Sequence, residues 1–155
     1  METESLARSI TQHPLVAGML DAHVEFLSGC AQNVRLAGGK FLFREGQCAD
    51  TLYLIRSGKI ALESHDGARG TLVVETVGAG DALGWSTLFP PYRWGLDARA
   101  VEPAFLFAID GPCLRSKLDA DHSFGYEFTR RLLNEVHTRL QRARLQTLDV
   151  YRAGP

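Results

Sequence analysis

The segment from Gly78 to Ala100 reads GAGDALGWSTLFPPYRWGLDARA. Its closely spaced glycines and its two adjacent prolines make it too rich in turn-forming residues for a plain strand or a long helix. It nevertheless holds large apolar side chains that favour burial, namely Trp85, Leu88, Phe89, Tyr92 and Trp94. A half-buried loop with free amides at its glycines is a natural cradle for an anion or another ligand. From these residues alone, a glycine-punctuated turn between strands, with aromatic side chains covering the core, is favoured over a ligand site.

The chain on both sides of this segment has the pattern of short strands broken by glycine. The pattern predicts strands over residues 33–37, 40–44, 51–56, 59–64, 71–77, 97–101 and 104–109. Asp66-Gly67 is the strongest hairpin signal, and residues 51–56 are apolar on both faces, as in a buried strand. Closely spaced short strands with glycine at their corners predict an antiparallel roll or barrel.

Helical patterns lie before and after the strands. Pro14 begins one predicted helix, whose apolar side holds Leu15, Val16, Met19 and Leu20, and Asp21 caps a second short helix. Residues 1–12 are polar and predicted to be frayed or disordered, so the domain is expected over 13–155. A short helix follows Gly111-Pro112, and a long one capped by Asp121 or Ser123 runs from 124 to 150.

The long helix carries an apolar seam. Its members recur at alternating steps of three and four residues and are Leu133, Val136, Leu140, Ala143, Thr147 and Val150. Such a heptad spacing predicts pairing with a second copy of the chain, in preference to a helix that docks only on its own domain. Leu132, Leu145 and Leu148 are expected to widen the stripe toward the roll. The arginines of this helix are interpreted as a solvated face, and these are Arg130, Arg131, Arg139, Arg142 and Arg144.

Composition narrows the class of protein. The 155 residues suit one domain, and the net charge of −1 gives no global attraction to nucleic acid or to an anionic membrane. No apolar run approaches the roughly 20 residues of a membrane span, and the start of the chain lacks a signal core. Cys30, Cys48 and Cys113 are widely spaced, which favours reduced cysteines in a cytoplasmic protein. No metal ligand cluster is expected, because the five histidines show no metal-binding spacing.

Three motifs, in order, resemble the cyclic-nucleotide-binding domain family, which includes the sensor domains of catabolite activator-type regulators and protein kinase A regulatory subunits. They are Phe43-Arg44-Glu45-Gly46, the strand pair from Leu52 to Ile60, and Gly78-Ala79-Gly80-Asp81-Ala82-Leu83-Gly84. The resemblance covers residues from about 13 to 142. It implies a mainly β fold with flanking helices (α+β): an eight-stranded β-roll over about 30–109, short N-terminal helices, and a C-terminal dimerisation helix over about 123–150.

The resemblance also implies where a ligand binds. In the family, Gly-Glu opens a short helix that holds a cyclic phosphate, the glutamate accepts from the ribose, and a later arginine pairs with the phosphate. Here Trp85 stands at the glutamate's place and Trp94 at the arginine's, with Arg93 one residue early. Loss of one charge-assisted bond costs about 1.5–3 kcal/mol, or one to two decades of affinity. The expected ligand residues are Gly84, Trp85, Ser86, Thr87, Arg93 and Trp94, with Arg99 a weaker alternative to Arg93. Each tryptophan either stacks on a ligand ring or fills the core.

These residues leave several functions open. The first is a regulatory module that senses a small molecule, with cAMP or cGMP as candidates and the long helix as the output. The second is a structural or interaction module that has lost its ligand. An enzyme is not expected, because no nucleophile, P-loop or metal constellation occurs. Direct DNA binding is not expected either, because the chain ends at Pro155 with no room for a helix-turn-helix after the long helix.

Overall fold

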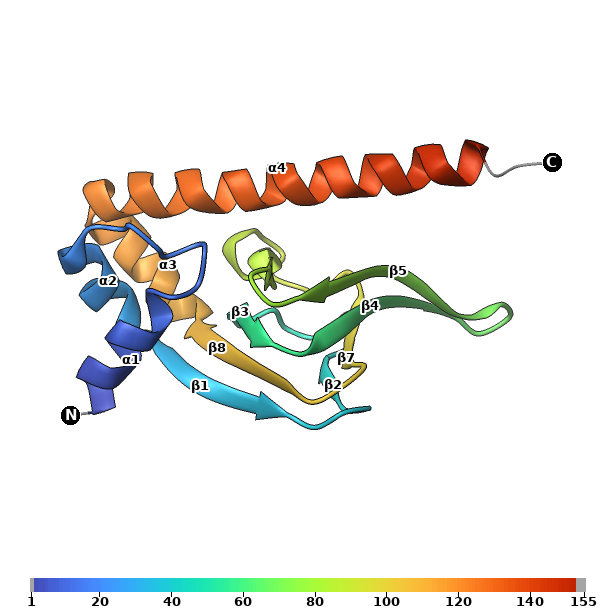
Figure 1. The fold of residues 1–155 in the computed structure, drawn as a ribbon, viewed down its shortest axis with the longest axis horizontal. Helices are drawn as coiled ribbons and strands as arrows, with labels where there is room; N and C mark the ends of the chain where they lie inside the picture. The colour runs from blue at the N-terminus through green and yellow to red at the C-terminus, as the bar shows by residue number, and fades with distance from the viewer. Residues whose placement is uncertain (1, 153–155) are drawn as a thin grey trace.

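Eight strands form two four-stranded antiparallel sheets in the computed structural model, which describes residues 2–152 (Figure 1). The strands are β1 (Ala31–Leu36), β2 (Phe41–Phe43), β3 (Thr51–Ser57), β4 (Lys59–Asp66), β5 (Gly70–Gly78), β6 (Ala82–Leu83), β7 (Asp97–Ala100) and β8 (Ala104–Asp110). One sheet has the order β1-β8-β3-β6 and the other β2-β7-β4-β5. The predicted eight-stranded roll with flanking helices is thereby confirmed.

The turns of the roll fall where glycine allows them. β4 and β5 form a long hairpin, and Asp66 pairs with Gly70 at its tip, as the Asp66-Gly67 signal predicts. β3 passes into the other sheet at Gly58, where a Cβ would lie 2.4 Å from the Pro103 carbonyl oxygen. β6 was not predicted, because its two residues lie inside the glycine-rich segment and are too short to show an alternation.

The N-terminal region differs from the prediction in three places. Residues expected to be frayed form α1 (Glu2–Ile10), and Ile10 is fully buried in the core. The helix predicted from Pro14 is a series of turns, because Gly18 adopts a left-handed conformation with φ of 80°. α2 (Asp21–Ser28) begins after Leu20, and Asp21 lies in its first turn without capping it.

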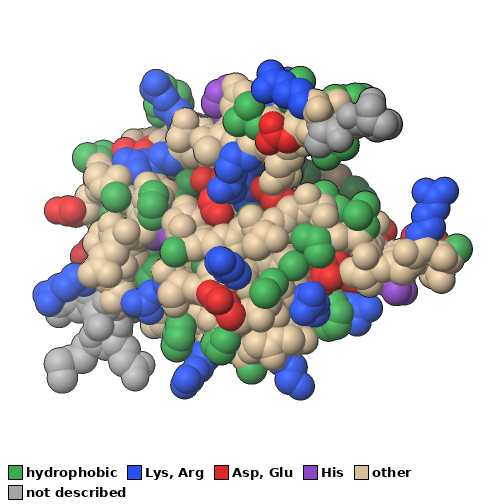
Figure 2. Space-filling model, turned by 45° about the vertical axis from the view of Figure 1, so that its right-hand side comes forward, with side chains coloured by type: hydrophobic (Ala, Val, Ile, Leu, Met, Phe, Trp, Pro, Cys, Tyr) green, Lys and Arg blue, Asp and Glu red, His purple; other side chains and the backbone are tan. Residues whose placement is uncertain are grey.

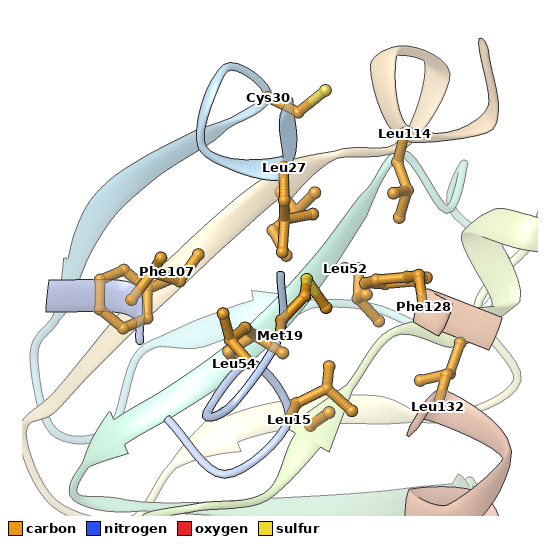
Figure 3. Packing of buried hydrophobic residues seen from close by; sticks show 14 of the residues in the cluster. Leu15, Met19, Leu27, Cys30, Leu52, Leu54, Phe107, Leu114, Phe128 and Leu132 are labelled. Atoms are coloured by element: carbon orange, nitrogen blue, oxygen red, sulfur yellow. The ribbon is translucent and has the colours of Figure 1, made fainter. Parts of the chain in front are cut away.

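Two hydrophobic cores hold the layers together. The first lies between one sheet and the helices, where side chains from β3, β8, α2, α3 and α4 converge (Figure 3). It contains Leu52, Phe107 and Phe128, all at most 1% exposed. The second core lies inside the roll and draws on both sheets, with Ile55, Leu106 and Trp94 among its members.

The C-terminal helices cover the roll. α3 (Gly111–Ala120) begins at Asp110, whose carboxylate accepts from the Cys113 amide at 2.9 Å. α4 (His122–Arg152) then runs along the whole molecule, above β5 (Figure 1). Asp121 caps α4 by accepting from the Phe124 amide at 3.1 Å, one of the two caps that the sequence predicted. Among residues 2–152, no helix combines the length and hydropathy needed to cross a bilayer.

The expectation that all cysteines are reduced is wrong for two of them. Cys30 and Cys113 form a disulfide, although 83 residues separate them in the sequence. The pairing of Ala31 with Ile109 between β1 and β8 brings the two cysteines together. Spacing along the chain gave no signal, because only the sheet register makes them neighbours. Cys48 remains free and exposed.

Candidate functional site

The site begins at Gly84, where the chain leaves β6 and enters the 3-10 helix η1 (Trp85–Leu88). We call residues 84–88 the cassette. Gly84 has a left-handed conformation with φ of 93°, and a Cβ there would lie 2.7 Å from the Thr51 carbonyl oxygen. Only glycine fits both the conformation and the close approach to β3. The sequence therefore predicted the position of this turn correctly.

The far end of the cassette is held by α3. Thr87 is fully buried, and a guanidinium nitrogen of Arg115 donates to its carbonyl oxygen. The Arg115 guanidinium also lies over the Tyr92 ring, 4.3 Å from its centroid. At the start of α3, a Cβ on Gly111 would lie 2.0 Å from the Thr87 hydroxyl oxygen. Thr87 thus contacts the protein's own helix, while the other residues of the cassette, Gly84, Trp85, Ser86 and Leu88, are half-buried.

Trp94 lies inside the roll. Its ring stacks on Phe43 with centroids 3.9 Å apart and an interplanar angle of 13°. It is 5% exposed, and its ring edge lies 3.1 Å from the position of a Cβ on Gly84. The space beside the cassette glycine is therefore filled by an indole from the core. A ligand contact by Trp94 stays a prediction.

The two arginines considered as counter-charges each have a partner within the chain. Arg93 is exposed, its backbone bridges to Cys48, and its guanidinium donates to the Gly46 carbonyl oxygen at 3.3 Å. Arg99 donates to the buried carboxylate of Glu63 at 2.7 Å. The resemblance placed Arg93 one residue before the family's arginine position, and a ligand contact by Arg93 or Arg99 stays a prediction.

A different arginine reaches the cassette. Arg139 of α4 is 5% exposed and lies over the face of Trp85, with 5.0 Å between its guanidinium carbon and the ring centroid. It forms a bidentate ion pair with Glu75 of β5 and donates to the Ala82 carbonyl oxygen. The interpretation of this arginine as part of a solvated face is wrong. The sequence held one sign of this burial. Arg139 lies seven residues, or about two helical turns, after the buried Leu132 and therefore on the same side of α4.

Two further carboxylates lie at this contact between α4 and the roll. Glu135 of α4 lies 3.6 Å from an Arg139 guanidinium nitrogen and accepts from the Ala82 amide at 3.1 Å. Burial raises the pKa of the Glu135 carboxyl. Asp81 accepts from Arg142 at 3.2 Å. Figure 2 shows basic and acidic side chains gathered between the upper helix and the sheets. The contact between α4 and the roll is therefore polar and charge-paired here.

An apolar groove lies on the helical side of the cassette. Its volume is about 1080 Å³, and η1, the Phe89–Tyr92 loop, α3 and α4 form its walls. Trp85, Leu88 and Phe89 line it from the cassette side, and Leu133 and Val136 from α4. The groove thus joins the predicted ligand residues to the predicted pairing seam.

The comparisons with known proteins agree with this architecture. The sequence model of the cyclic nucleotide-binding domain matches residues 33–121, which is more than half of the chain. The chain belongs to the cyclic nucleotide-binding domain family. The resemblance carried by the three motifs is thereby confirmed.

Solved structures of this family share the fold at low sequence identity. A cyclic nucleotide-binding domain from Methylobacillus flagellatus KT has a TM-score of 0.78 at 20% identity, over 96% of this chain and 83% of that one. The sensor domain of the transcriptional regulator DNR from Pseudomonas aeruginosa has 0.71 at 18%, over 91% and 95%. The cAMP complex of the Toxoplasma gondii protein kinase A regulatory domain has 0.64 at 14%, over 74% and 44%.

The curated relatives are much longer proteins. Uncharacterised proteins from two Mycobacterium tuberculosis strains, H37Rv and CDC 1551, are 32% identical over 90 residues. The match covers 58% of this chain and only 17% of those proteins. Family membership rests on the match of residues 33–121 to the family's sequence model, and it supports a regulatory module that senses a ligand.

The predicted seam lies at the surface of α4. Leu133 is 67% exposed and Leu140 47%, while Val136 is half-buried at the groove. The seam's later members, Ala143 and Thr147, are exposed. Leu145 and Leu148 were expected to face the roll, but they are also exposed, because α4 has no contact with the roll after Arg142 that buries a side chain.

Proposed function

We propose that this chain senses a small molecule at its cassette and signals through α4, which pairs with a second copy of the chain. One observation carries the proposal: α4 is fastened to the residue that leads into the cassette. Glu135 accepts from the Ala82 amide, and Arg139 donates to the Ala82 carbonyl oxygen. Ala82 lies two residues before Gly84, so a shift of the cassette acts directly on α4.

The ligand in this proposal contacts the accessible part of the cassette, at Gly84, Trp85 and Ser86. The solved Toxoplasma structure contains cAMP, and cAMP and cGMP are the first molecules to test on this chain. We expect both to bind weakly, because an indole stands where the family has its sugar-binding carboxylate. An indole N–H can donate but cannot accept a hydrogen bond. Trp94, in place of the phosphate-binding arginine, lies in the core.

The test is a thermal-shift screen of cyclic and linear nucleotides, with calorimetry on every hit. A ligand that binds only the folded state raises the melting temperature, by RT ln(1 + [L]/Kd) in free energy. A hit must also change the emission of Trp85 in a Trp94→Phe variant, in which Trp85 is the remaining tryptophan. Tight cAMP binding with no response of Trp85 would contradict the proposed site. The absence of any ligand response would remove the sensing function.

The pairing of α4 is tested separately. The exposed seam residues Leu133 and Leu140 would bury their side chains in a dimer, at about 25 cal/mol per Å² of apolar surface. Leu140→Asp places a charge in the seam, whereas Gln141→Asp places the same charge at an exposed position outside the seam, about 100° further round α4. Sedimentation of the wild-type chain should show a dimer that Leu140→Asp weakens at least tenfold and Gln141→Asp leaves intact. A wild-type monomer at 100 µM, well above about 1 µM for a stable dimer, would refute pairing.

One observation favours a second candidate, an interaction module without a ligand. The Trp94 ring fills the space beside Gly84, so the roll interior is closed by the protein's own side chain. In this case α4 would still pair, but no small molecule would alter the Trp85 emission or the dimer affinity. The two candidates therefore differ in the ligand screen and agree in the sedimentation test.

A further inference from the structure

The buried guanidinium of Arg139 is surrounded by groups that together suit the binding of a guanidinium ion. Glu75 accepts two hydrogen bonds from the edge of its guanidinium, and the Ala82 carbonyl oxygen accepts a third. The Trp85 ring lies against the guanidinium, and Glu135 lies 3.6 Å from one of its nitrogens. We call these four residues the Arg139 site. They come from β5, β6, η1 and α4.

The Arg139 site favours a planar cation. Bidentate hydrogen bonding to a carboxylate requires the fixed fork of a guanidinium, which an ammonium group lacks. The indole face attracts a cation that lies within about 6 Å of the ring centroid. Two carboxylates and a carbonyl oxygen repel an anion at the same position. The polarity here is therefore opposite to that of a phosphate cradle.

We propose that the Arg139 site is a guanidinium-binding site that the chain fills with its own α4 side chain. Its occupant holds α4 against β5 and β6, so Arg139 acts as an internal ligand. This inference rests on the geometry around Arg139 and does not depend on the sensing function. It predicts that the site, once emptied, accepts a free guanidinium compound and rejects an anion.

The experiment empties the site and refills it. Arg139→Ala removes all atoms beyond Cβ, and N-ethylguanidinium supplies the same atoms as a free molecule. We expect Arg139→Ala to lower the melting temperature and N-ethylguanidinium, at about five times its Kd, to restore about 2–4 °C. The matched control is Arg144→Ala, which removes an exposed arginine from the same helix. This control and the wild type should show no saturable response to N-ethylguanidinium.

Two other probes define the specificity. n-Butylammonium carries the same charge without the planar fork, and it should restore the Arg139→Ala variant several-fold less effectively. cAMP should not restore it. Trypsin cleavage after Arg142 and Arg144 should be faster in Arg139→Ala and slow again with N-ethylguanidinium, because refilling the site fastens α4. Three results would each overturn the proposal. The first is an equal rise in melting temperature in Arg139→Ala and Arg144→Ala, the second is equal restoration by N-ethylguanidinium and n-butylammonium, and the third is restoration by cAMP.

A second pair of variants covers the case in which Arg139→Ala does not fold. Arg139→Lys keeps the charge, and Glu75→Gln keeps the shape of the acceptor. We expect Arg139→Lys to lower the melting temperature, and Glu75→Gln to cost much less in the lysine background than in the wild type. Additive effects of the two changes, or a lysine variant as stable as the wild type, would show that the site has no preference for guanidinium.

Discussion

Replacement of Trp94 tests whether the indole at the family's arginine position is a core residue or a ligand contact. Trp94→Ala removes a side chain that is 5% exposed and stacked on Phe43. A buried tryptophan contributes about 150–250 Å² of surface, which at about 25 cal/mol per Å² corresponds to about 4–6 kcal/mol as an upper limit. Measured losses for Trp→Ala in cores are about 3–5 kcal/mol, because a cavity remains. We therefore expect a loss of about 3–5 kcal/mol and a melting temperature lower by about 6–20 °C.

The assay is urea unfolding followed by far-ultraviolet circular dichroism, which does not depend on tryptophan emission. Trp94→Phe is the matched variant, because it keeps an aromatic ring against Phe43 and should cost only about 1–2 kcal/mol. A loss below about 1 kcal/mol for Trp94→Ala would refute a core position, because a cavity of this size destabilises a core by more than that. A variant that keeps its stability but loses binding of a screened ligand would instead identify Trp94 as a ligand contact.

Three further predictions follow from particular contacts. In urea unfolding, Gly84→Ala should lower the stability by more than about 2 kcal/mol, because the Cβ meets the Thr51 carbonyl oxygen at 2.7 Å. The control Gly67→Ala has no atom within 4 Å of its Cβ and should change the stability by less than about 0.5 kcal/mol. The Cys30–Cys113 disulfide closes a loop of 83 residues. In a Cys48→Ser background, its reduction should lower the unfolding free energy by about 4–5 kcal/mol. Equal stability with and without reductant would show that the bond does not form. Burial lowers the pKa of His13 below the 6.5 of a free histidine, so the unfolding free energy should be constant above pH 6.5 and decrease as the pH falls below 6.5. His13→Asn should flatten this pH dependence. An unchanged pH dependence in the variant would assign the effect to another group.

The sequence was sufficient for every strand except β6 and insufficient for the N-terminal segment that precedes the strands. Residues 52–55 are apolar on both faces of the strand, so their burial in β3 follows from composition. α1 was missed because a short polar helix gains its stability from tertiary packing, which the sequence does not show; in the structure Leu6, Ala7 and Ile10 pack against the core. The turn at Gly18 was taken for a helix, because the apolar spacing of Leu15 and Met19 resembles a helical period even where glycine breaks it.

The turn at Gly84 could be predicted from the sequence, but the contacts of the cassette could not. A glycine-rich turn is local and readable along the chain, whereas the cassette itself was expected only from the family resemblance. The partners of the cassette are not local: Arg115 is 28 residues from Thr87, and Arg139 is 64 residues from Glu75. Composition places arginine at the surface by default, because a buried guanidinium needs partners that only the fold reveals. The burial of Arg139 had one sign along the chain: Phe128, Leu132 and Arg139 follow one another at helical spacing and so lie on the same side of α4.

The two tryptophans and Arg139 are consistent with a single physical requirement. At these two family positions, a glutamate without the matching arginine, or the reverse, would leave a charge unpaired, and burial of an unpaired charge costs several kcal/mol. Indoles at both positions avoid that cost: Trp94 lies in the core of the roll, and Trp85 is half-buried beside the groove. The charges lie instead at the contact between the roll and α4, where Glu75 and Glu135 receive Arg139. Because this contact is complete within the chain, α4 is fastened to the roll without any bound anion. Any ligand that moves α4 must therefore compete with a covalently attached side chain, whose effective concentration is in the millimolar range or higher.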